Sequence, residues 1–310
     1  MDGGTVHVCG NLPSRVLTGK AHAEKVRVLL AVGGSKSGPG FSTMIHDPSL
    51  FKECVKRLVD LVMANGYDGI DVDWEFPEKA EKQNVVEFVR ALRLELNRAN
   101  PQALLTMALP ATAYYGSRYD GPQLAPLVDF VQVMTYDLHG PSRHGLVFSH
   151  SGHNSPLHET DTDPIDGKQL SFTKSVDYWC ANGFPKEKLL VGIPLYGHGF
   201  AVNEWGKTPT VAAPHPDITF KKIQALLDKG WVRHWDAMAC VPWIQSPAGE
   251  PLEIISYDDA KSAALKGRWA RAAGLGGYFF WEISQDLVNG RNILVQAARN
   301  GYDLPPLSSH

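Results

Sequence analysis

Apolar and polar positions follow two periods along this chain. Short apolar runs typical of buried strands lie at 26–32, 68–77, 104–109, 130–135, 189–193, 254–257 and 277–281. Between them, apolar residues return every three or four positions, which predicts helices over 48–65, 83–99, 172–182, 219–229, 258–273 and 292–300. Strands that alternate with amphipathic helices indicate a parallel β/α architecture.

The first of these helices has both ends marked in the sequence. Asp47 offers a capping side chain, Pro48 suits the first helical position, and Gly66 suits the end. Residues 2–24 read instead as polar and turn-rich, with a short strand-like piece at 5–9.

The run at 68–77, Asp-Gly-Ile-Asp-Val-Asp-Trp-Glu-Phe-Pro, combines apolar and acidic residues. Because side chains alternate along a strand, Asp71, Asp73 and Glu75 are expected on one face, opposite an apolar one. Adjacent acids would lie about 7 Å apart, and each charged pair would cost roughly 2 kcal/mol at an effective dielectric of about 20. Such a row favours a carboxylic acid that stays protonated near neutral pH.

Composition narrows the function. The chain has 310 residues, of which 44% are hydrophobic and 20% charged, and its net charge of −3 argues against a nucleic-acid partner. No apolar run reaches the length of a membrane span, and Met1 is followed by polar residues and glycines rather than by a signal peptide. The four cysteines include no closely spaced pair, so a metal site is not expected, and disulfide pairing stays open.

Candidate functional residues fall at the carboxyl ends of several strands, as in a (β/α)8 barrel. No GxGxxG motif opens a helix, which disfavours a doubly wound dinucleotide fold. We therefore predict an α/β fold of the TIM (β/α)8 type, with about six of its eight strands recognisable.

Asp68 to Pro77 resembles the DxxDxDxE signature of family 18 glycoside hydrolases, the chitinases, at every defining position. Residues 31–34 resemble the family's SxGG motif, with Ala31 in place of Ser, and Ser35 stands where an aromatic residue often follows. Met134, Tyr136 and Asp137 match its MxYD motif.

Residues 276–282 resemble the last barrel strand of the family, which carries Trp281. The resemblance covers roughly residues 24 to 300 and implies that the first two β/α units of the barrel are lacking. It implies a small α+β insertion that forms a wall of the cleft. The chain is thereby divided into the first part of the barrel at 1–198, the insertion at 199–253, and the last strand and helices of the barrel at 254–302.

The resemblance implies retaining hydrolysis of β-1,4-linked N-acetylglucosamine polymers, assisted by the substrate's own acetamido group. Glu75 would act as acid and then base, Asp73 would orient the acetamido group, and Asp71 would tune Asp73. Tyr136 and Asp137 would hold the same acetamido group.

Four further residues are expected to contact sugar: Trp281 beneath the ring, Met134, Tyr196 and Arg233. No cofactor is implied, and the substrate is chitin or a chitooligosaccharide. Full-length members of this family are mostly secreted. Oligomeric state, and endo or exo action, stay open.

Other interpretations remain at this point. The alternatives are a non-catalytic, chitin-binding lectin, an inactive truncated barrel, and an endo-β-N-acetylglucosaminidase that cuts N-glycan cores. A phosphate loop at residues 31–34 is disfavoured because the GxxxxGK[ST] spacing is absent. Residues 137–168 are predicted to form a long polar loop. A metal site in this loop is disfavoured by the irregular spacing of the candidate ligands, which are His144, His150, His153, His158, Glu159, Asp161 and Asp163.

Overall fold

The computed structural model describes residues 3–8, 15–140, 150–160 and 170–305. The chain forms two compact units, Met1–Gln132 with Trp179–Lys188, and Val133–Tyr178 with Leu189–His310. The order of the six-stranded sheet is β1-β2-β3-β4 through the first unit and β4-β5-β11 through the second. The number of strands predicted for the barrel, six, is therefore confirmed within the described residues. The seventh predicted run, at 254–257, belongs to a separate antiparallel sheet.

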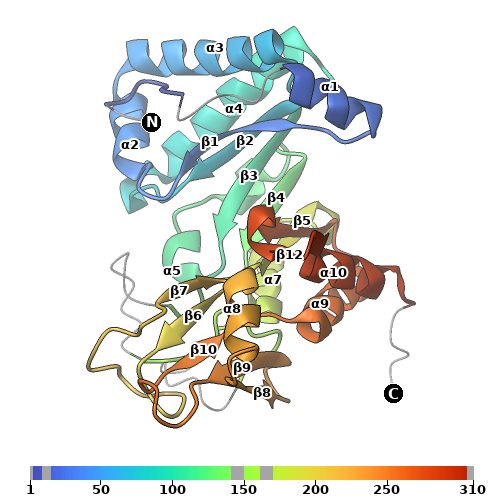
Figure 1. Cartoon of the computed structure of the whole chain (residues 1–310). Helices are drawn as coiled ribbons and strands as arrows, with labels where there is room; N and C mark the ends of the chain where they lie inside the picture. The colour runs from blue at the N-terminus through green and yellow to red at the C-terminus, as the bar shows by residue number, and fades with distance from the viewer. Residues whose placement is uncertain (1–2, 9–14, 141–149, 161–169, 306–310) are drawn as a thin grey trace. The chain divides into compact units, whose positions relative to one another are not determined.

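The first unit is built on β1 (Leu29–Gly34), β2 (Gly69–Trp74) and β3 (Leu104–Pro110), followed by the start of β4 (Phe130–Met134). β1 pairs in parallel with β2, and β2 pairs in parallel with β3. Helices α3 (Pro48–Asn65) and α4 (Lys82–Ala99) lie side by side along these strands (Figure 1). Their inward faces bury a row of aliphatic side chains: Val55, Leu58, Val62, Val86, Val89, Leu92 and Leu96.

The ends of α3 form as the sequence predicts. The Asp47 carboxylate accepts hydrogen bonds from Ser49 N (2.8 Å) and Leu50 N (3.1 Å), Pro48 begins the helix, and Gly66 ends it at φ 73°. These local signals suffice because each concerns only the first or last turn of one helix.

Two helices of the first unit were not predicted from the sequence. Helix α1 (Arg15–Ala23) buries only Thr18, so it has no apolar stripe to detect. Helix α2 (Gly38–His46) begins Gly-Pro-Gly, which argues against a helix, yet Phe41 and Met44 are fully buried. Tertiary packing thus outweighs the low intrinsic helix propensity of α2. The short elements of this unit are η1 (Lys79–Glu81), α5 (Ala113–Gly116), α6 (Gly121–Leu124) and η2 (Lys186–Lys188).

The second unit contains the end of β4, then β5 (Leu189–Pro194) and β11 (Gly277–Trp281), which pair in parallel. Helices α9 (Ala260–Ala272) and α10 (Ile293–Asp303) pack against each other. Helix α7 (Phe172–Ala181) has its first residues in this unit and its last in the first unit. The remaining pieces are η3 (Ile283–Asp286) and the hairpin of β12 (Leu287–Val288) and β13 (Arg291–Asn292).

The second unit also holds an antiparallel sheet of order β7-β6-β10-β9-β8. Its strands are β6 (Tyr196–Phe200), β7 (Asp217–Thr219), β8 (Val232–Asp236), β9 (Val241–Gln245) and β10 (Ile254–Ser256), and α8 (Phe220–Leu227) follows β7. Phe200, Val202 and Ile254 form a small core against Trp205 and Trp243. This sheet and α8 lie within residues 196–256, and the bounds of the expected α+β insertion, 199–253, stay a prediction.

None of the helices among residues 3–8, 15–140, 150–160 and 170–305 is long and apolar enough to cross a membrane.

Candidate active site

Strand β2 places Asp71 between two neighbours in the sheet, Ala31 on β1 and Thr106 on β3. The Thr106 hydroxyl donates to Asp71 Oδ1 (2.5 Å). Burial raises the pKa of Asp71 above its ordinary range, and hydrogen bonds from Thr106 and Gln132 oppose this shift only in part. Asp71 is thus a carboxyl group for which ionisation is costly.

Asp73 lies two residues further along the same strand. Burial, and then the negative charge of Asp71, raise the pKa of Asp73 to about 6. Its Oδ1 atom is buried and has no hydrogen-bond partner among the described residues. Since buried polar atoms in proteins are nearly always paired, this oxygen is suited to meet a donor on a ligand.

The strand ends at Trp74, so Glu75 lies outside it. Glu75 is thus the first residue beyond the strand, and its place on the same face as Asp71 and Asp73 stays a prediction. Its backbone is held by the chain after β1: Glu75 N donates to Ser37 Oγ (3.3 Å), and Glu75 O accepts from Gly38 N (3.2 Å). These bonds to the chain after β1 replace the sheet ladder, and Glu75 stays partly buried.

The glycine-rich turn at the end of β1 lies so close to β2 that one of its positions has no room for a side chain. A Cβ on Gly33, whose φ is 125°, would lie 1.8 Å from the carbonyl oxygen of Asp73. Ser37, at the end of this turn, also donates to Asp73 O (3.3 Å). The turn therefore supports the acidic segment, and Ser37 is a supporting residue that sequence reasoning missed.

Asp68, the first acid of the signature, has a different environment. Its Oδ2 accepts from Val28 N (2.7 Å) and lies 2.9 Å from His22 Nε2. It fastens the chain entering β1 to the start of β2, so its part is structural.

In the second unit, the chain after β4 carries Tyr136 and Asp137. Asp137 has φ 55°, and its N–H donates to Asn154 Oδ1 (2.8 Å). Its Oδ1 accepts from the Tyr196 hydroxyl (2.5 Å) and lies 2.8 Å from His198 Nε2. The predicted site residues Asp137 and Tyr196 are thus in direct contact, whereas Asn154 and His198 were missed.

The charge on Asp137 is favoured by this environment. Desolvation by the surrounding protein works to raise the pKa of Asp137, although 57% of the side chain is exposed. The hydrogen bond and positive charge of His198, with the bond from Tyr196, outweigh that effect and hold the pKa below its usual range. Asp137 is therefore a carboxylate with one oxygen engaged inside the protein.

Tyr136 is buried and edge-on to Tyr196, with ring centroids 6.2 Å apart, and to Phe279, at 6.0 Å. Gly192 makes room for it, because a Cβ there would lie 2.4 Å from Tyr136 Cε1. Met134, two residues earlier on β4, is partly buried.

Trp281 ends β11 and is 51% exposed, which is unusual for so large an apolar side chain. Arg233, on β8, donates from Nε to Asp259 Oδ2 (2.9 Å) and lies over the Trp235 ring at 5.5 Å. This ion pair gives Arg233 a structural partner, and its contact with sugar stays a prediction.

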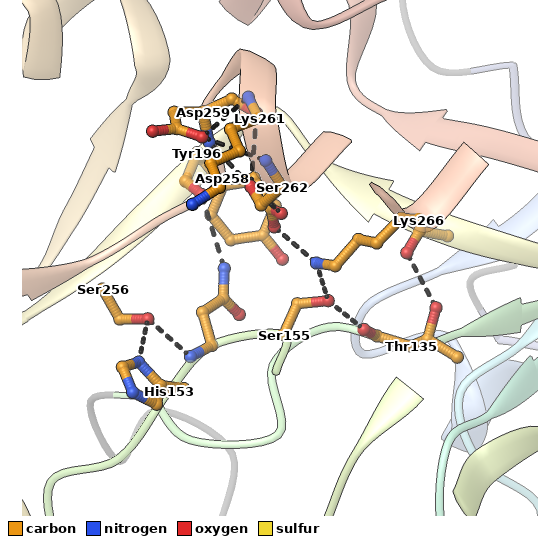
Figure 2. Close-up of polar contacts among 12 residues, drawn as sticks. Thr135, His153, Ser155, Tyr196, Ser256, Asp258, Asp259, Lys261, Ser262 and Lys266 are labelled. Atoms are coloured by element: carbon orange, nitrogen blue, oxygen red, sulfur yellow. Dashed lines mark hydrogen bonds and ion pairs between the residues drawn. The ribbon is translucent and has the colours of Figure 1, made fainter. Parts of the chain in front are cut away.

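A buried polar network supports the segment before Tyr136 (Figure 2). Lys266 is fully buried on α9, and its Nζ donates to Asp258 Oδ2 (2.7 Å) and to Ser155 Oγ (2.8 Å). Ser155 Oγ in turn donates to the carbonyl oxygen of Thr135 (2.5 Å). Ser262 Oγ donates to the other oxygen of Asp258 (2.7 Å), so each polar end of the network is paired.

The polar loop does not gather a metal site in the part that the structure describes, where no group of three ligating side chains occurs. His144, Asp161 and Asp163 lie outside the described residues. His153 is buried, with Nδ1 3.2 Å from Ser256 Oγ and Nε2 3.1 Å from Asp236 Oδ2. Cys54 and Cys240 are free thiols.

Comparison with known proteins adds an independent line of evidence. The sequence profile described as "Glycosyl hydrolases family 18" matches residues 12–286. A probable endochitinase of Caenorhabditis elegans is 31% identical over 286 residues, which cover 86% of this chain and 45% of that protein. Chitinase A1 of Niallia circulans is 28% identical over 318 residues, covering 92% of this chain and 44% of that protein.

Among solved structures, the Group IV chitinase of Ostrinia furnacalis superposes with a TM-score of 0.83 at 25% identity, covering 93% of this chain and 83% of that one. Together with the family match, this likeness confirms the TIM-barrel type of fold predicted from the sequence. The chain spans somewhat less than half the length of the endochitinase and of chitinase A1.

Proposed function

The chain belongs to glycosyl hydrolase family 18, and from this premise we propose that it hydrolyses β-1,4-linked N-acetylglucosamine polymers with retention of configuration. The observation that carries the proposal is the pair of acids on β2. Asp73 has a raised pKa of about 6 and a buried oxygen that lacks a partner among the described residues. A carboxyl group in that state is suited to accept a hydrogen bond from a substrate N–H and to take on charge during a reaction.

In the proposed reaction, Glu75 protonates the glycosidic oxygen as the bond from that oxygen to the anomeric carbon breaks. The oxygen of the 2-acetamido group forms a bond to the same carbon, giving an oxazolinium ion. Asp73 accepts from the acetamido N–H and stabilises the positive charge. Water then attacks the anomeric carbon, gives a proton to Glu75, and restores the acetamido group, so that configuration is retained.

The roles of the remaining residues stay part of the proposal. Asp71 raises the cost of ionising Asp73, which supports proton sharing between the two. Tyr136 and Asp137 would hold the acetamido group, and Trp281 would stack on a sugar ring. The exposed position of Trp281 and the ionised state favoured for Asp137 support these roles.

The test is hydrolysis of a soluble chitooligosaccharide by the purified chain, followed by reducing-end release and by proton NMR of the fresh products. The expected result is release of reducing sugar with the β-anomer formed first. Folded protein that releases no sugar, or that forms the α-anomer first, contradicts the proposal.

A second candidate is binding of chitooligosaccharide without hydrolysis. It is favoured by Ala31, which stands opposite Asp71 on β1 where the family motif has Ser, and by Ser35 in place of an aromatic residue. Titration calorimetry in parallel with the hydrolysis assay separates the two, since this candidate requires binding heat with no product. A branched N-glycan core, assayed alongside, distinguishes an endo-β-N-acetylglucosaminidase.

A further inference from the structure

His198 is a buried histidine on β6 whose two ring nitrogens both face acceptors. Nε2 lies 2.8 Å from Asp137 Oδ1, and Nδ1 lies 3.0 Å from Asp217 Oδ1 and 3.3 Å from Pro216 O. Carboxylates and carbonyls can only accept, so both nitrogens must carry protons for these contacts to be hydrogen bonds. The geometry therefore requires an imidazolium cation between two carboxylates.

The surroundings of this cation come from several elements. Asp137 follows β4, Asp217 begins β7, and the Tyr196 ring, on the strand of His198 itself, lies edge-on at 5.4 Å. On the side of Nε2, a Cβ on Gly140 would lie only 3.0 Å away, so the ring is enclosed there too. Burial works to lower the pKa of His198, but the bonds and charges of Asp137 and Asp217 outweigh it and raise the pKa to about 9.

The bridge also decides which oxygen of Asp137 can meet a ligand. His198 and the Tyr196 hydroxyl both engage Oδ1. More than half of the Asp137 side chain is nevertheless exposed, which leaves Oδ2 as the outward oxygen. Asn154 holds the backbone N–H of the same residue, so the side chain and the main chain are fixed by separate contacts.

We propose that His198 is a positioning residue for the hydrolysis: bridged to Asp217, it keeps Asp137 ionised and turned so that Oδ2 is presented to the bound sugar as a hydrogen-bond acceptor. This inference rests on the proposed function of the chain. His198 itself touches no substrate and acts through Asp137.

The bridge predicts a specific pH dependence. When His198 loses a proton above about pH 9, one ring nitrogen becomes an acceptor that faces a carboxylate, and the attraction that orients Asp137 is lost. Activity should therefore fall along an alkaline limb. In Asp217→Asn, removal of one carboxylate should move this limb down by about one pH unit. In His198→Asn, kcat/KM should fall about 10²-fold and this limb should disappear.

The experiment combines kcat/KM on a chitooligosaccharide from pH 5 to 10 with an NMR titration of 13C-labelled histidine rings. The His198 signal is assigned by its absence in His198→Asn. His46→Gln is the matched control, since His46 is an exposed histidine 3.6 Å from the carboxylate of Glu81, and this change should leave the alkaline limb unmoved.

The expected results are titration of His198 near pH 9 and a lowered alkaline limb in Asp217→Asn. Titration of His198 near the ordinary value of about 6.5 overturns the bridge. An active wild-type chain whose alkaline limb is unmoved in Asp217→Asn overturns the positioning role alone, since a merely structural residue would change melting temperature and not the limb. Titration near pH 9 in a folded chain that hydrolyses nothing overturns the proposed function, and with it the positioning role.

Discussion

The carboxyl groups at the ends of β2 and β4 belong to the same chain and face opposite electrostatic conditions. On β2, Asp71 and Asp73 form no ion pair within the described residues, and burial raises the pKa of both. After β4, Asp137 meets the imidazolium of His198, and its pKa is lowered. The contrast teaches that burial and neighbouring charge, rather than residue type, decide the direction in which the pKa of each acid shifts.

The largest effect on activity is expected from replacing Glu75, the acid that follows Asp71 and Asp73. Glu75→Gln should lower kcat on a chitooligosaccharide by about 10³-fold, equivalent to about 4 kcal/mol, because the amide cannot donate a proton to the leaving group. Glu53→Gln, on the exposed face of α3, is the control and should keep full activity. Equal activity of Glu75→Gln and wild type would end the assignment of Glu75 as the acid.

The buried pair of Lys266 and Asp258 tests how strongly the second unit depends on its cations. Lys266→Met should lower the free energy of unfolding by about 3 kcal/mol, since it leaves the buried carboxylate of Asp258 without its cationic partner. Urea denaturation measures this loss. Lys56→Met, which breaks an exposed pair with Asp60 on α3, should cost less than about 1 kcal/mol.

The double variant Lys266→Met with Asp258→Asn should recover part of the lost stability because no charge is then buried alone. If the single and double variants are equally unstable, charge pairing is not the reason for the loss.

Asp73 should give a smaller effect that depends on pH. Asp73 titrates near 3.9 in an unfolded chain and near 6 in the folded one, so the folded state binds the extra proton between these values. Its contribution to stability therefore falls as pH rises from about 4 to about 6. The stability of Asp73→Asn relative to wild type should be greater at pH 7 than at pH 4 by on the order of 2 kcal/mol. Urea denaturation at both pH values measures it, and an equal difference at both contradicts the raised pKa.

Asp137 should show the smallest change and the opposite sign. Its pKa is lowered in the fold, so its ionised form stabilises the protein above about pH 4, and that stability is lost as pH falls through the folded value. Asp137→Asn should lower the melting temperature at pH 7 and have little effect near pH 3. The shift is expected to be modest because the side chain is largely exposed and solvent screens its charge. A loss of stability that is larger at low pH would reverse the comparison.

The parts of the fold that follow from the sequence are those determined within a few residues. Asp47, Pro48 and Gly66 bound α3 through contacts in its own first and last turns. Helix α2 could not be predicted in this way, because its Phe41 is buried by a residue far along the chain. The Phe41 ring stacks on the ring of Trp74, on β2, with the ring centroids 4.7 Å apart.

The same division holds for the candidate site. The acids of β2 and the Tyr136-Asp137 pair are visible as contiguous motifs. His198 meets Asp137 across 61 positions of sequence, and Asn154 meets it across 17, with no local pattern to mark either. The end of β2 involves a similar long-range contact, because Glu75, the first residue after the strand, bonds through its N–H to Ser37, 38 positions earlier.

The Lys266 network has a consequence for divergence among related chains. Ser155 and Lys266 are separated by 111 positions, yet neither Lys266 nor Asp258 can be exchanged alone without stranding the other's charge in the interior. Lineages that abandon this pair must therefore pass through a weakened intermediate or change both codons together. Positions 258 and 266 should accordingly vary in concert across an alignment, with position 155 following the size and polarity of whatever replaces them.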